Sequence, residues 1–262
     1  MNKFPKFATG QIRTVLIFVI SFSAAFYGLA RLLPAQSQAS PSAGEAGGTS
    51  LLEGFRHVEV ASVSDALEQI AGKRMYMTHH MQPIFPSKFA GYALTVSLKK
   101  AEANNDPAAL SGMIAAIDQG SPDSVYVMVV EDGADIAGMG GLMGTAMSAR
   151  NFAGAVIDGG VRDVAYLRKI GFPVYALGMV PSTSVNHYRF AGANIPVTCD
   201  GVSVQAGDIV VADPDGIAVV PRARAQEVLT LAQQMDFKEH SMYPYIEKYK
   251  SLGEAIKKFG RL

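Results

Sequence analysis

Residues 125–130 read Val125-Tyr126-Val127-Met128-Val129-Val130, a continuous apolar run rich in β-branched and aromatic side chains. A run of this kind is typical of a strand that is buried on both faces of a sheet. Two more such runs follow at residues 155–157 and 174–177, and stretches with helical spacing at about 142–150 and 163–170 separate the three. Three strands joined by two helices of this length predict right-handed crossovers, and therefore a parallel sheet at the centre of an α/β fold.

The segments before these strands alternate in the same way. A helix is predicted over residues 63–70, with Ser64 as its candidate cap, and a strand over residues 92–98. Asp106-Pro107 has the pattern of an N-cap followed by proline at the first helical position. This pattern predicts a helix that opens there and ends at Gly120.

The chain after Pro181 changes character. Four short strands, separated by glycine and aspartate turns, are predicted at residues 195–197, 202–204, 209–211 and 217–220. Two helices, over about 223–237 and 245–259, then close the chain. These features predict a mainly antiparallel or barrel-like β layer followed by helices, within one α/β domain rather than two independent ones.

The composition excludes several classes of protein. The 262 residues include 49% hydrophobic residues, 23 lysines and arginines against 23 acidic residues, one cysteine and no tryptophan. A chain of this length can bury a sizeable core. A net charge of zero argues against a nucleic-acid-binding protein, which usually has a basic excess. Cys199 has no second cysteine with which to form an internal disulfide or a zinc cluster.

The first 39 residues have the layout of an export signal. They hold four basic residues and no acid, which leaves 19 basic residues (23 less 4) against 23 acidic ones in the rest of the chain. A basic start, an apolar run at residues 15–30 and small residues at 37–39 predict a signal peptide cleaved after Ala39, or alternatively an uncleaved membrane anchor. Residues 40–50 are small and polar and predict a flexible linker. Both interpretations place the folded body, residues 51–262, outside the cytoplasm, in the periplasm or the extracellular space.

Two loops follow neighbouring strands of the predicted sheet, where ligands bind in open parallel sheets. The first, residues 138–144, reads Gly-Met-Gly-Gly-Leu-Met-Gly and opens a helix whose backbone N–H groups can hold a carboxylate or phosphate. It lacks the dinucleotide fingerprint, because Met143 stands at the third glycine, and it lacks the Lys-Ser/Thr pair of a P-loop. The loop is therefore a candidate anion site. The alternative is that its glycines serve tight turning and close helix packing.

The second loop, residues 157–163, ends in the pair Arg162-Asp163. An arginine can bind a substrate carboxylate as a fork, and an adjacent aspartate can hold a hard cation. The alternative is ordinary loop chemistry, with Asp158-Gly159 as a turn and Asp163 as a favourable charge in a first helical turn. Since both loops would line one crevice, the functional interpretation is favoured.

Several motifs occur together in the order of one known family. They are Gly140-Gly141-Leu142-Met143, Gly154-Ala155-Val156-Ile157-Asp158-Gly159 before Arg162-Asp163, Gly207-Asp208-Ile209-Val210-Val211-Ala212-Asp213, and Gly216-Ile217-Ala218-Val219-Val220-Pro221. Over residues 51–262 the chain resembles the RraA-like family, which includes the class II 4-hydroxy-4-methyl-2-oxoglutarate aldolases. The resemblance implies a swivelling-type α/β/β fold, homotrimers or hexamers, and active sites between subunits.

The resemblance also assigns roles to residues. It implies that Asp163 is the ligand of a divalent ion, Mg²⁺ or Mn²⁺. Binding of the pyruvyl end of a substrate is implied for the side chain of Arg162 and for the backbone of four consecutive residues, Gly140, Gly141, Leu142 and Met143. Glu239 is our candidate for a catalytic carboxylate that reaches over from a neighbouring subunit.

One position departs from the family pattern. Aldolases of this family usually carry an acid three residues after the aspartate of the Arg-Asp pair, and this chain has Tyr166 there. The departure bears on the aldol half of the substrate more than on metal or pyruvyl binding. Some relatives are described as regulators that bind a cytoplasmic ribonuclease, a partner that an exported protein would not meet.

Other reactive side chains have structural explanations. Adjacent His79 and His80 would face opposite sides of a strand and could not bind one metal. His187 lies in a predicted polar loop, and Cys199 is predicted as a small buried residue. Lys99 is the lysine placed to form a Schiff base in a class I mechanism, but it belongs to a Lys-Lys pair that is typical of a solvated strand end.

The combined pattern predicts a metal-dependent carbon–carbon lyase acting on a small pyruvyl-type 2-oxo acid. The reaction would be retro-aldol cleavage of a 4-hydroxy-2-oxo acid or decarboxylation of an oxaloacetate-like acid, since both leave an enolate that a divalent metal can stabilise. The alternative, from a different class, is a non-catalytic exported module that binds a small organic acid or serves assembly.

Overall fold

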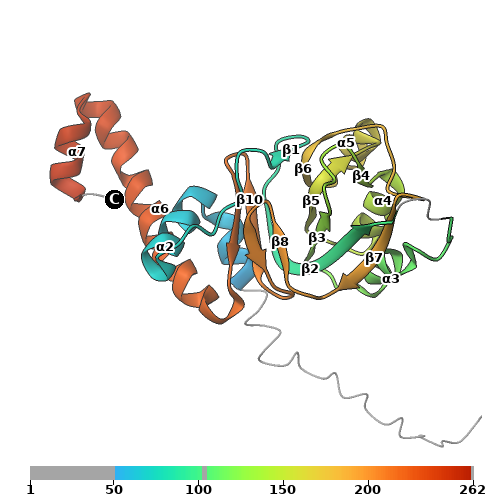
Figure 1. Ribbon diagram of the computed structural model, residues 1–262. Helices are drawn as coiled ribbons and strands as arrows, with labels where there is room; N and C mark the ends of the chain where they lie inside the picture. Colours follow the sequence, from blue (N-terminus) through green and yellow to red (C-terminus); the bar gives the residue numbers. More distant parts are fainter. Residues whose placement is uncertain (1–50, 102–104, 261–262) are drawn as a thin grey trace, which may run out of the picture. The chain divides into compact units, whose positions relative to one another are not determined.

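The computed structural model describes residues 51–101 and 105–260, in which strands and helices alternate (Figure 1). The signal or anchor predicted over residues 1–39 and the linker predicted over residues 40–50 lie outside this part. The helices are α2 (Val60–Ala71), α3 (Ser111–Gln119), α4 (Gly141–Ala149), α5 (Val164–Ile170), the short 3-10 helix η1 (Arg222–Arg224), α6 (Ala225–Tyr249) and α7 (Leu252–Phe259), and residues 51–57 are also helical. Among the described residues, no helix is both long enough and apolar enough to cross a membrane.

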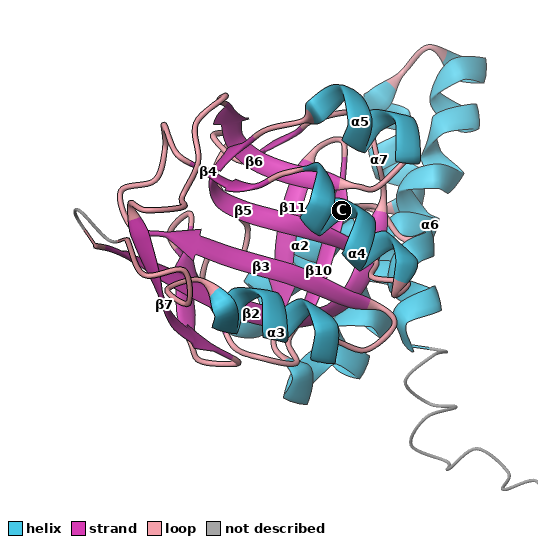
Figure 2. Ribbon diagram, turned by 90° about the vertical axis from the view of Figure 1, so that its right-hand side faces the viewer, coloured by secondary structure: helices cyan, strands magenta, loops and turns pink. Residues whose placement is uncertain are grey.

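A nine-stranded sheet with a parallel centre carries the fold (Figure 2). The strands are β1 (Gln82–Pro83), β2 (Phe89–Lys100), β3 (Ser124–Val130), β4 (Ala137–Met139), β5 (Gly154–Val161), β6 (Val174–Met179), β7 (Tyr188–Ala193), β10 (Ile209–Asp213) and β11 (Gly216–Val220), and a separate hairpin holds β8 (Val197–Cys199) and β9 (Val202–Val204). β2, β3, β5 and β6 run parallel, with Tyr126 in register between Leu94 and Ala155. The predicted α/β class with a parallel central sheet and C-terminal helices is confirmed.

The sheet is nearly closed on itself. At one end, β10 pairs antiparallel with β2 and with β11. At the other end, β1 pairs antiparallel with β6. Shortly before β1, Tyr76 bridges to Ala218 of β11, and the N–H of Met77 donates to the carbonyl of Ile217 (3.0 Å). The segment 76–83 therefore spans the gap between β11 and β6. β10 and β11, which belong to the predicted mainly antiparallel or barrel-like β layer, extend the main sheet.

Alternation along the strands explains why the central runs are continuously apolar. Tyr126 and Met128 of β3 pack under α3, α4 and α5, which cover one face of the sheet (Figure 2). Val125 and Val127 point to the opposite, inner face, where they pack with the β8–β9 hairpin and the inward side chains of β10 and β11. The outward side chains of β10, such as Ile209, pack under α2 and α6. Both faces of the central strands are therefore buried.

Two helix starts differ from the prediction. α2 begins at Val60, so Ser64 lies inside the helix; the cap residue is Glu59, whose N–H donates to Oδ1 of Asp236 (3.1 Å). α3 begins at Ser111, because Oδ1 of Asp106 accepts the N–H of Ala108 (2.8 Å) and closes a local turn instead of opening the helix. The predicted end of α3 at Gly120 is confirmed.

The chain around residues 186–199 also differs from the prediction. The polar loop expected there becomes β7 from Tyr188 onward, paired antiparallel with the end of β2. Tyr188 is buried, and its hydroxyl donates to the carbonyl of Glu131 (2.8 Å). The strand predicted at 195–197 lies two residues later, as β8. β7 extends the sheet surface beside the carboxyl ends of the parallel strands.

Candidate functional site

The two predicted loops meet at the carboxyl end of β5. α4 begins directly after β4, and the Arg162-Asp163 pair directly follows β5. The N–H of Gly141 donates to Oδ2 of Asp163 (2.8 Å), and the N–H of Arg162 donates to the carbonyl of Met139 (3.0 Å). The structure therefore brings the glycine loop and the Arg-Asp pair together as one continuous surface, although Gly141 and Asp163 are 22 residues apart in sequence.

The backbone at Asp163 aims its carboxylate at α4. Asp163 is the N-cap of α5 with φ 58° and ψ 31°, a left-handed conformation that aspartate tolerates better than most residues. Its side chain makes no capping bond to α5. Oδ2 is bound by Gly141, whereas Oδ1 accepts no hydrogen bond from any described residue. The half-exposed carboxylate therefore has one oxygen fixed and one oxygen free for a ligand.

The first turn of α4 presents backbone donors. Gly140 is its N-cap and has no side chain to cap the helix, and of the N–H groups in this turn the Asp163 carboxylate binds only that of Gly141. Within the described ranges, the N–H groups of Leu142 and Met143 have no acceptor, unlike that of Gly141. Free N–H groups and the positive end of the helix dipole favour an anion at this position.

Glycine at residue 140 permits the close approach of the pair. A Cβ added to Gly140 would lie 2.7 Å from Oδ2 of Asp163 and 3.1 Å from Cγ of Arg162. Contacts under about 3 Å force one of the partners to move. The glycine therefore serves the packing of the site as well as the tight turn.

The side chain of Arg162 is held in place, but only part of its hydrogen-bonding capacity is used. Its Nη1 donates to the carbonyl of Ser182 (3.2 Å), and its Nε lies 3.9 Å from Oδ2 of Asp163. The remaining guanidinium N–H groups have no acceptor in the described part of the chain. Arg162 lines a small pocket of about 80 Å³ together with Gly140, Met143 and Ser184. The guanidinium is therefore free to bind a small carboxylate as a fork.

A second, wider pocket lies on the Asp163 side. It has a volume of about 580 Å³, and its lining includes Leu142, Asp163 and Tyr166. Mg²⁺ and Mn²⁺ prefer oxygen ligands and often combine one or two carboxylates with waters and substrate oxygens. Asp163 has one free carboxylate oxygen beside this open pocket, so it is the residue that could hold such an ion.

The rim of these pockets is apolar and exposed. Leu142 of the wider pocket is 90% exposed although it lies at the start of α4, and Val185 of the small pocket is also exposed. Large apolar side chains gathered in this way at the surface are typical of interaction sites. This surface is suited to contact another protein chain.

Glu239 lies elsewhere in the same chain. It stands on α6, where its Oε1 accepts a hydrogen bond from the hydroxyl of Tyr243 (2.7 Å). It lines a groove of about 310 Å³ with Asp65 and Glu68 of α2. One chain therefore does not bring Glu239 to Arg162 and Asp163. Asp65 lies in the second turn of α2.

The other candidate residues have local partners. His79 and His80 lie on a turn rather than a strand, with ring centroids 4.3 Å apart. Lys99 is exposed at the end of β2 and bonds Glu131 (2.8 Å), which holds the pKa of the Glu131 carboxyl below its usual range. Cys199 is buried, and burial raises the pKa of its thiol. His187 is exposed.

Residues 182–184 are part of the site and were not predicted. The carbonyl of Ser182 holds Arg162, and the Oγ of Ser182 accepts the N–H of Ala137, the first residue of β4 (3.0 Å). Thr183 and Ser184 line the small pocket. The sequence does contain a pattern that could have pointed to these residues. The run Ser-Thr-Ser follows the predicted strand 174–177, on the side of its carboxyl end, where ligands bind in parallel sheets.

The fold and the site define an α/β domain with a nearly closed sheet and a candidate anion site at the carboxyl ends of its parallel strands. The family model for RraA-like proteins, described as Aldolase/RraA, matches residues 60–219. The chain belongs to the RraA-like family, as its motifs predicted.

Individual relatives agree with this assignment. The chain is 27% identical over 181 residues to a protein of Halalkalibacterium halodurans provisionally named 4-hydroxy-4-methyl-2-oxoglutarate aldolase, covering 69% of this chain and 80% of that one. It is 27% identical to an uncharacterized protein from Pseudomonas syringae pv. tomato of known crystal structure, with a TM-score of 0.73 and coverage of 80% and 94%. The crystal structure of RraAS2 from Streptomyces coelicolor, described as an unusual member of the RNase ES inhibitor RraA protein family, is 26% identical, with a TM-score of 0.66 and coverage of 74% and 96%.

Proposed function

We propose that this protein is a divalent-metal-dependent lyase that releases pyruvate from a 2-oxo acid. The substrate is a 4-hydroxy-2-oxo acid cleaved by a retro-aldol reaction, or an oxaloacetate-like acid that is decarboxylated. The observation that carries the proposal is the carboxylate of Asp163, fixed against the start of α4 beside the free N–H groups of Arg162. The provisional name of the Halalkalibacterium relative supports the lyase class.

Each part of the site has a defined task in this proposal. Arg162 binds the substrate carboxylate as a fork, and the N–H groups of Leu142 and Met143 hold the same end of the molecule. Bound by Asp163, Mg²⁺ or Mn²⁺ would supply positive charge at the 2-keto oxygen, where the negative charge of the enolate develops. The bond between C3 and C4 breaks and its electron pair forms the enolate. A proton leaves the 4-hydroxyl, or CO₂ leaves in decarboxylation, and a proton then adds to C3 to give pyruvate.

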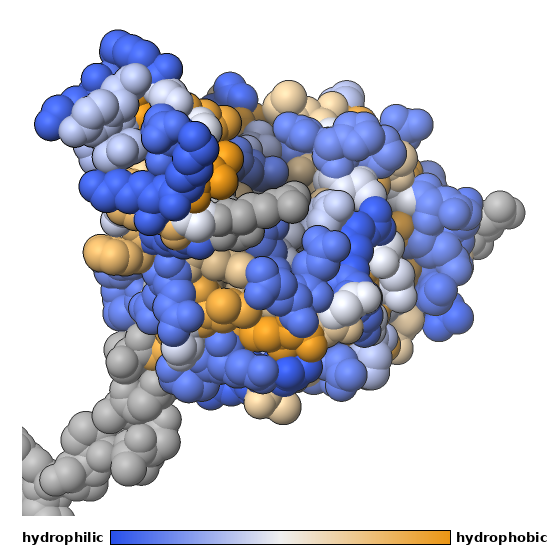
Figure 3. All heavy atoms as spheres, turned by 90° about the vertical axis from the view of Figure 1, so that its left-hand side faces the viewer, coloured by the Kyte–Doolittle hydropathy of each residue, from blue (hydrophilic) through white to orange (hydrophobic). Residues whose placement is uncertain are grey.

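In this proposal a water bound to the metal or to an acid accepts the proton, and a carboxylate from a second copy of the chain supports it. We place Glu239 of the partner subunit opposite Arg162 and Asp163, in a homotrimer or hexamer. The apolar rim around Leu142 supports a subunit contact there. The face in Figure 3, on which α6 and α7 lie, has hydrophobic side chains among hydrophilic ones, and Phe237 and Leu252 of these helices are exposed. Such a surface supports further contacts between copies.

Turnover tests the proposal directly. With Mg²⁺ or Mn²⁺, we expect pyruvate release from at least one member of a panel of 4-hydroxy-2-oxo acids and oxaloacetate, measured by a coupled pyruvate assay. Chelation should abolish release, and re-addition of the ion should restore it. Borohydride added with substrate should leave Lys99 unmodified, because this lysine is exposed and paired with Glu131. A borohydride adduct on Lys99 would identify a class I mechanism instead.

A non-catalytic binding module is the second candidate. It is favoured by the description of RraAS2 within an inhibitor family and by Tyr166, which takes the place of the acid usual in the aldolases. This module would use the same anion site. Oxalate or pyruvate would then raise the unfolding temperature, while no acid in the panel releases pyruvate.

Gly140→Ala tests the close packing of the site. The new methyl group would displace the Asp163 carboxylate, since the two would otherwise lie 2.7 Å apart. We expect pyruvate release to fall about 10-fold to 100-fold, because misplacing a catalytic group by about 1 Å commonly lowers the rate by this much. Gly178→Ala in β6 is the control, because no atom lies within 4 Å of its added Cβ. Equal activity of both variants would show that the observed Gly140 contact does not position the pair.

A further inference from the structure

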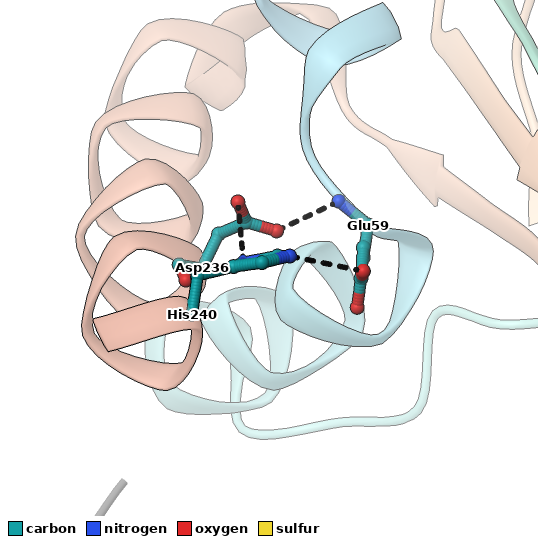
Figure 4. Close-up of side chains that lie close together, drawn as sticks. All are labelled: Glu59, Asp236 and His240. Atoms are coloured by element: carbon teal, nitrogen blue, oxygen red, sulfur yellow. Dashed lines mark hydrogen bonds and ion pairs between the residues drawn. The ribbon is translucent and has the colours of Figure 1, made fainter. Parts of the chain in front are cut away.

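Three side chains with metal-ligand chemistry converge between α2 and α6 (Figure 4). Asp236 and His240 lie one helical turn apart on α6, so they share a face of that helix. Glu59 is the N-cap of α2. One donor atom from each residue lies within 4.8 Å of the other two. The cluster shares no helix or strand with the Arg162-Asp163 site.

We propose that Glu59, Asp236 and His240 form a binding site for Zn²⁺ or a similar divalent transition metal. The three residues supply one imidazole nitrogen and two carboxylates. Zinc sites that keep an open position use three protein ligands drawn from these types. The proposal concerns other residues than Arg162 and Asp163 and a different class of ion; Glu239, which the reaction proposed above takes from a partner subunit, is the neighbour of His240 on α6 but is not a ligand here.

The orientation of His240 makes Nε2 the ligand atom. Its Nδ1 lies 2.8 Å from the backbone carbonyl of Asp236. A carbonyl oxygen only accepts, so Nδ1 carries the proton and the lone pair of the neutral ring is on Nε2. Nε2 points toward Oε1 of Glu59 (Figure 4). Metal-binding histidines usually have this arrangement, in which the second ring nitrogen donates to a carbonyl or carboxylate.

The spacing between Nε2 and Glu59 suits an ion between them. The two atoms are 3.5 Å apart, which exceeds the roughly 2.7–2.9 Å of a charge-assisted hydrogen bond. Ligand atoms held about 2.0–2.2 Å from a tetrahedral zinc ion lie roughly 3.3–3.5 Å apart. The pair is therefore spaced like two ligands of one ion.

Asp236 is already held in place for such a role. Its Oδ1 accepts the N–H of Glu59 (3.1 Å), while its Oδ2 lies 3.4 Å from Nδ1 of His240. The carboxylate is thereby fixed before any ion binds. Such fixation lowers the entropic cost of ordering the ligands.

Charge and access also favour a cation. The bond to the Asp236 carbonyl and the nearby carboxylates raise the pKa of His240, so an ion that binds Nε2 has to displace a proton from it. With the ring then neutral, the cluster carries two negative charges, and no lysine or arginine in the described ranges forms an ion pair with Glu59 or Asp236. The side chains of Glu59, Asp236 and His240 are 43%, 18% and 49% exposed, so an ion can enter and keep water as a further ligand. An imidazole ligand favours zinc over Mg²⁺ or Ca²⁺.

Zinc binding would join the start of α2 to the middle of α6. These helices cover the outward side chains of β10 and β11. An ion that binds the folded chain and not the unfolded one stabilises the fold by mass action. A Zn²⁺ concentration about 100 times the dissociation constant should raise the unfolding temperature by roughly 5–10 °C.

The experiment titrates Zn²⁺ into the metal-free full-length chain by calorimetry and records unfolding temperatures in parallel. We expect the wild-type chain to bind one equivalent of Zn²⁺. His240→Gln, Glu59→Gln and Asp236→Asn should each lower the Zn²⁺ affinity at least about 10-fold. Asp236→Asn separates metal binding from folding, because it removes the carboxylate charge while its amide oxygen can still accept the N–H of Glu59. His57→Gln is the matched control, since this exposed histidine faces one carboxylate, that of Glu53, instead of two.

The outcomes separate this site from the one proposed for catalysis. Asp163→Asn should keep the zinc equivalent, and the zinc-site variants should keep their affinity for Mg²⁺. Unchanged zinc affinity in His240→Gln and Asp236→Asn would overturn the proposal, as would a wild-type chain that takes up no zinc. Since the readout is binding and not turnover, failure of the lyase proposal would leave this result interpretable.

Discussion

Asp163→Asn is expected to lower Mg²⁺-dependent pyruvate release at least about 100-fold, because it removes the charge that the ion needs from its protein ligand. The fold should be unaffected. Asparagine tolerates the left-handed backbone at this residue, and its amide oxygen can still accept the N–H of Gly141. The unfolding temperature should therefore stay within about 2 °C of wild type.

The measurement is a Mg²⁺ titration of folded Asp163→Asn together with its activity at rising Mg²⁺. We expect weaker Mg²⁺ affinity and partial recovery of pyruvate release at high Mg²⁺. Asp163→Ala is a poorer test, because alanine is strained at a φ of 58° and leaves the N–H of Gly141 without its acceptor. Wild-type Mg²⁺ affinity in Asp163→Asn would remove Asp163 as the metal ligand, and with it the main support for the proposed site.

The parallel centre of the fold was predictable because its strands are buried on both faces. Val127 packs inside the curved sheet and Met128 packs under the helices, so both kinds of position are apolar. This pattern is local in sequence and needs no knowledge of partners. The helices between the strands then require parallel crossovers.

The closure of the sheet could not be predicted from local patterns. Tyr76 pairs with Ala218, 142 residues further along the chain, and no periodicity signals the contact. The start of α2 depends in the same way on Asp236, whose carboxylate binds the N–H of Glu59. Long-range partners of this kind override the local cap signal of Ser64.

The candidate site was predictable as a set of residues but not as a geometry. The rule that ligands bind at the carboxyl ends of parallel strands pointed to Gly140 and to the Arg162-Asp163 pair. The left-handed backbone at Asp163 and the bond from Arg162 to the carbonyl of Ser182 appear only in the structure. The sequence cannot indicate which backbone carbonyl accepts the bond from Arg162, because every residue has a carbonyl.

Arg162→Ala is expected to weaken oxalate and substrate binding by about 1.5–3 kcal/mol, roughly 10-fold to 150-fold, while Mg²⁺ affinity stays near that of wild type. The loss follows from removing the guanidinium N–H groups that have no acceptor in the described part of the chain. Arg162→Lys should be intermediate, because lysine keeps the charge and loses the fork.

Calorimetric titration of oxalate in the presence of Mg²⁺ measures this effect. Arg150→Ala is the matched control, since Arg150 also donates one side-chain bond to a backbone carbonyl, that of Gly120, at the opposite end of α4. If Arg162 served only to hold the loop at Ser182, both alanine variants would lower the unfolding temperature and neither would selectively lose oxalate. Selective loss of oxalate binding in Arg162→Ala, with Mg²⁺ affinity retained, would assign the guanidinium to the substrate and separate its role from that of its neighbour Asp163.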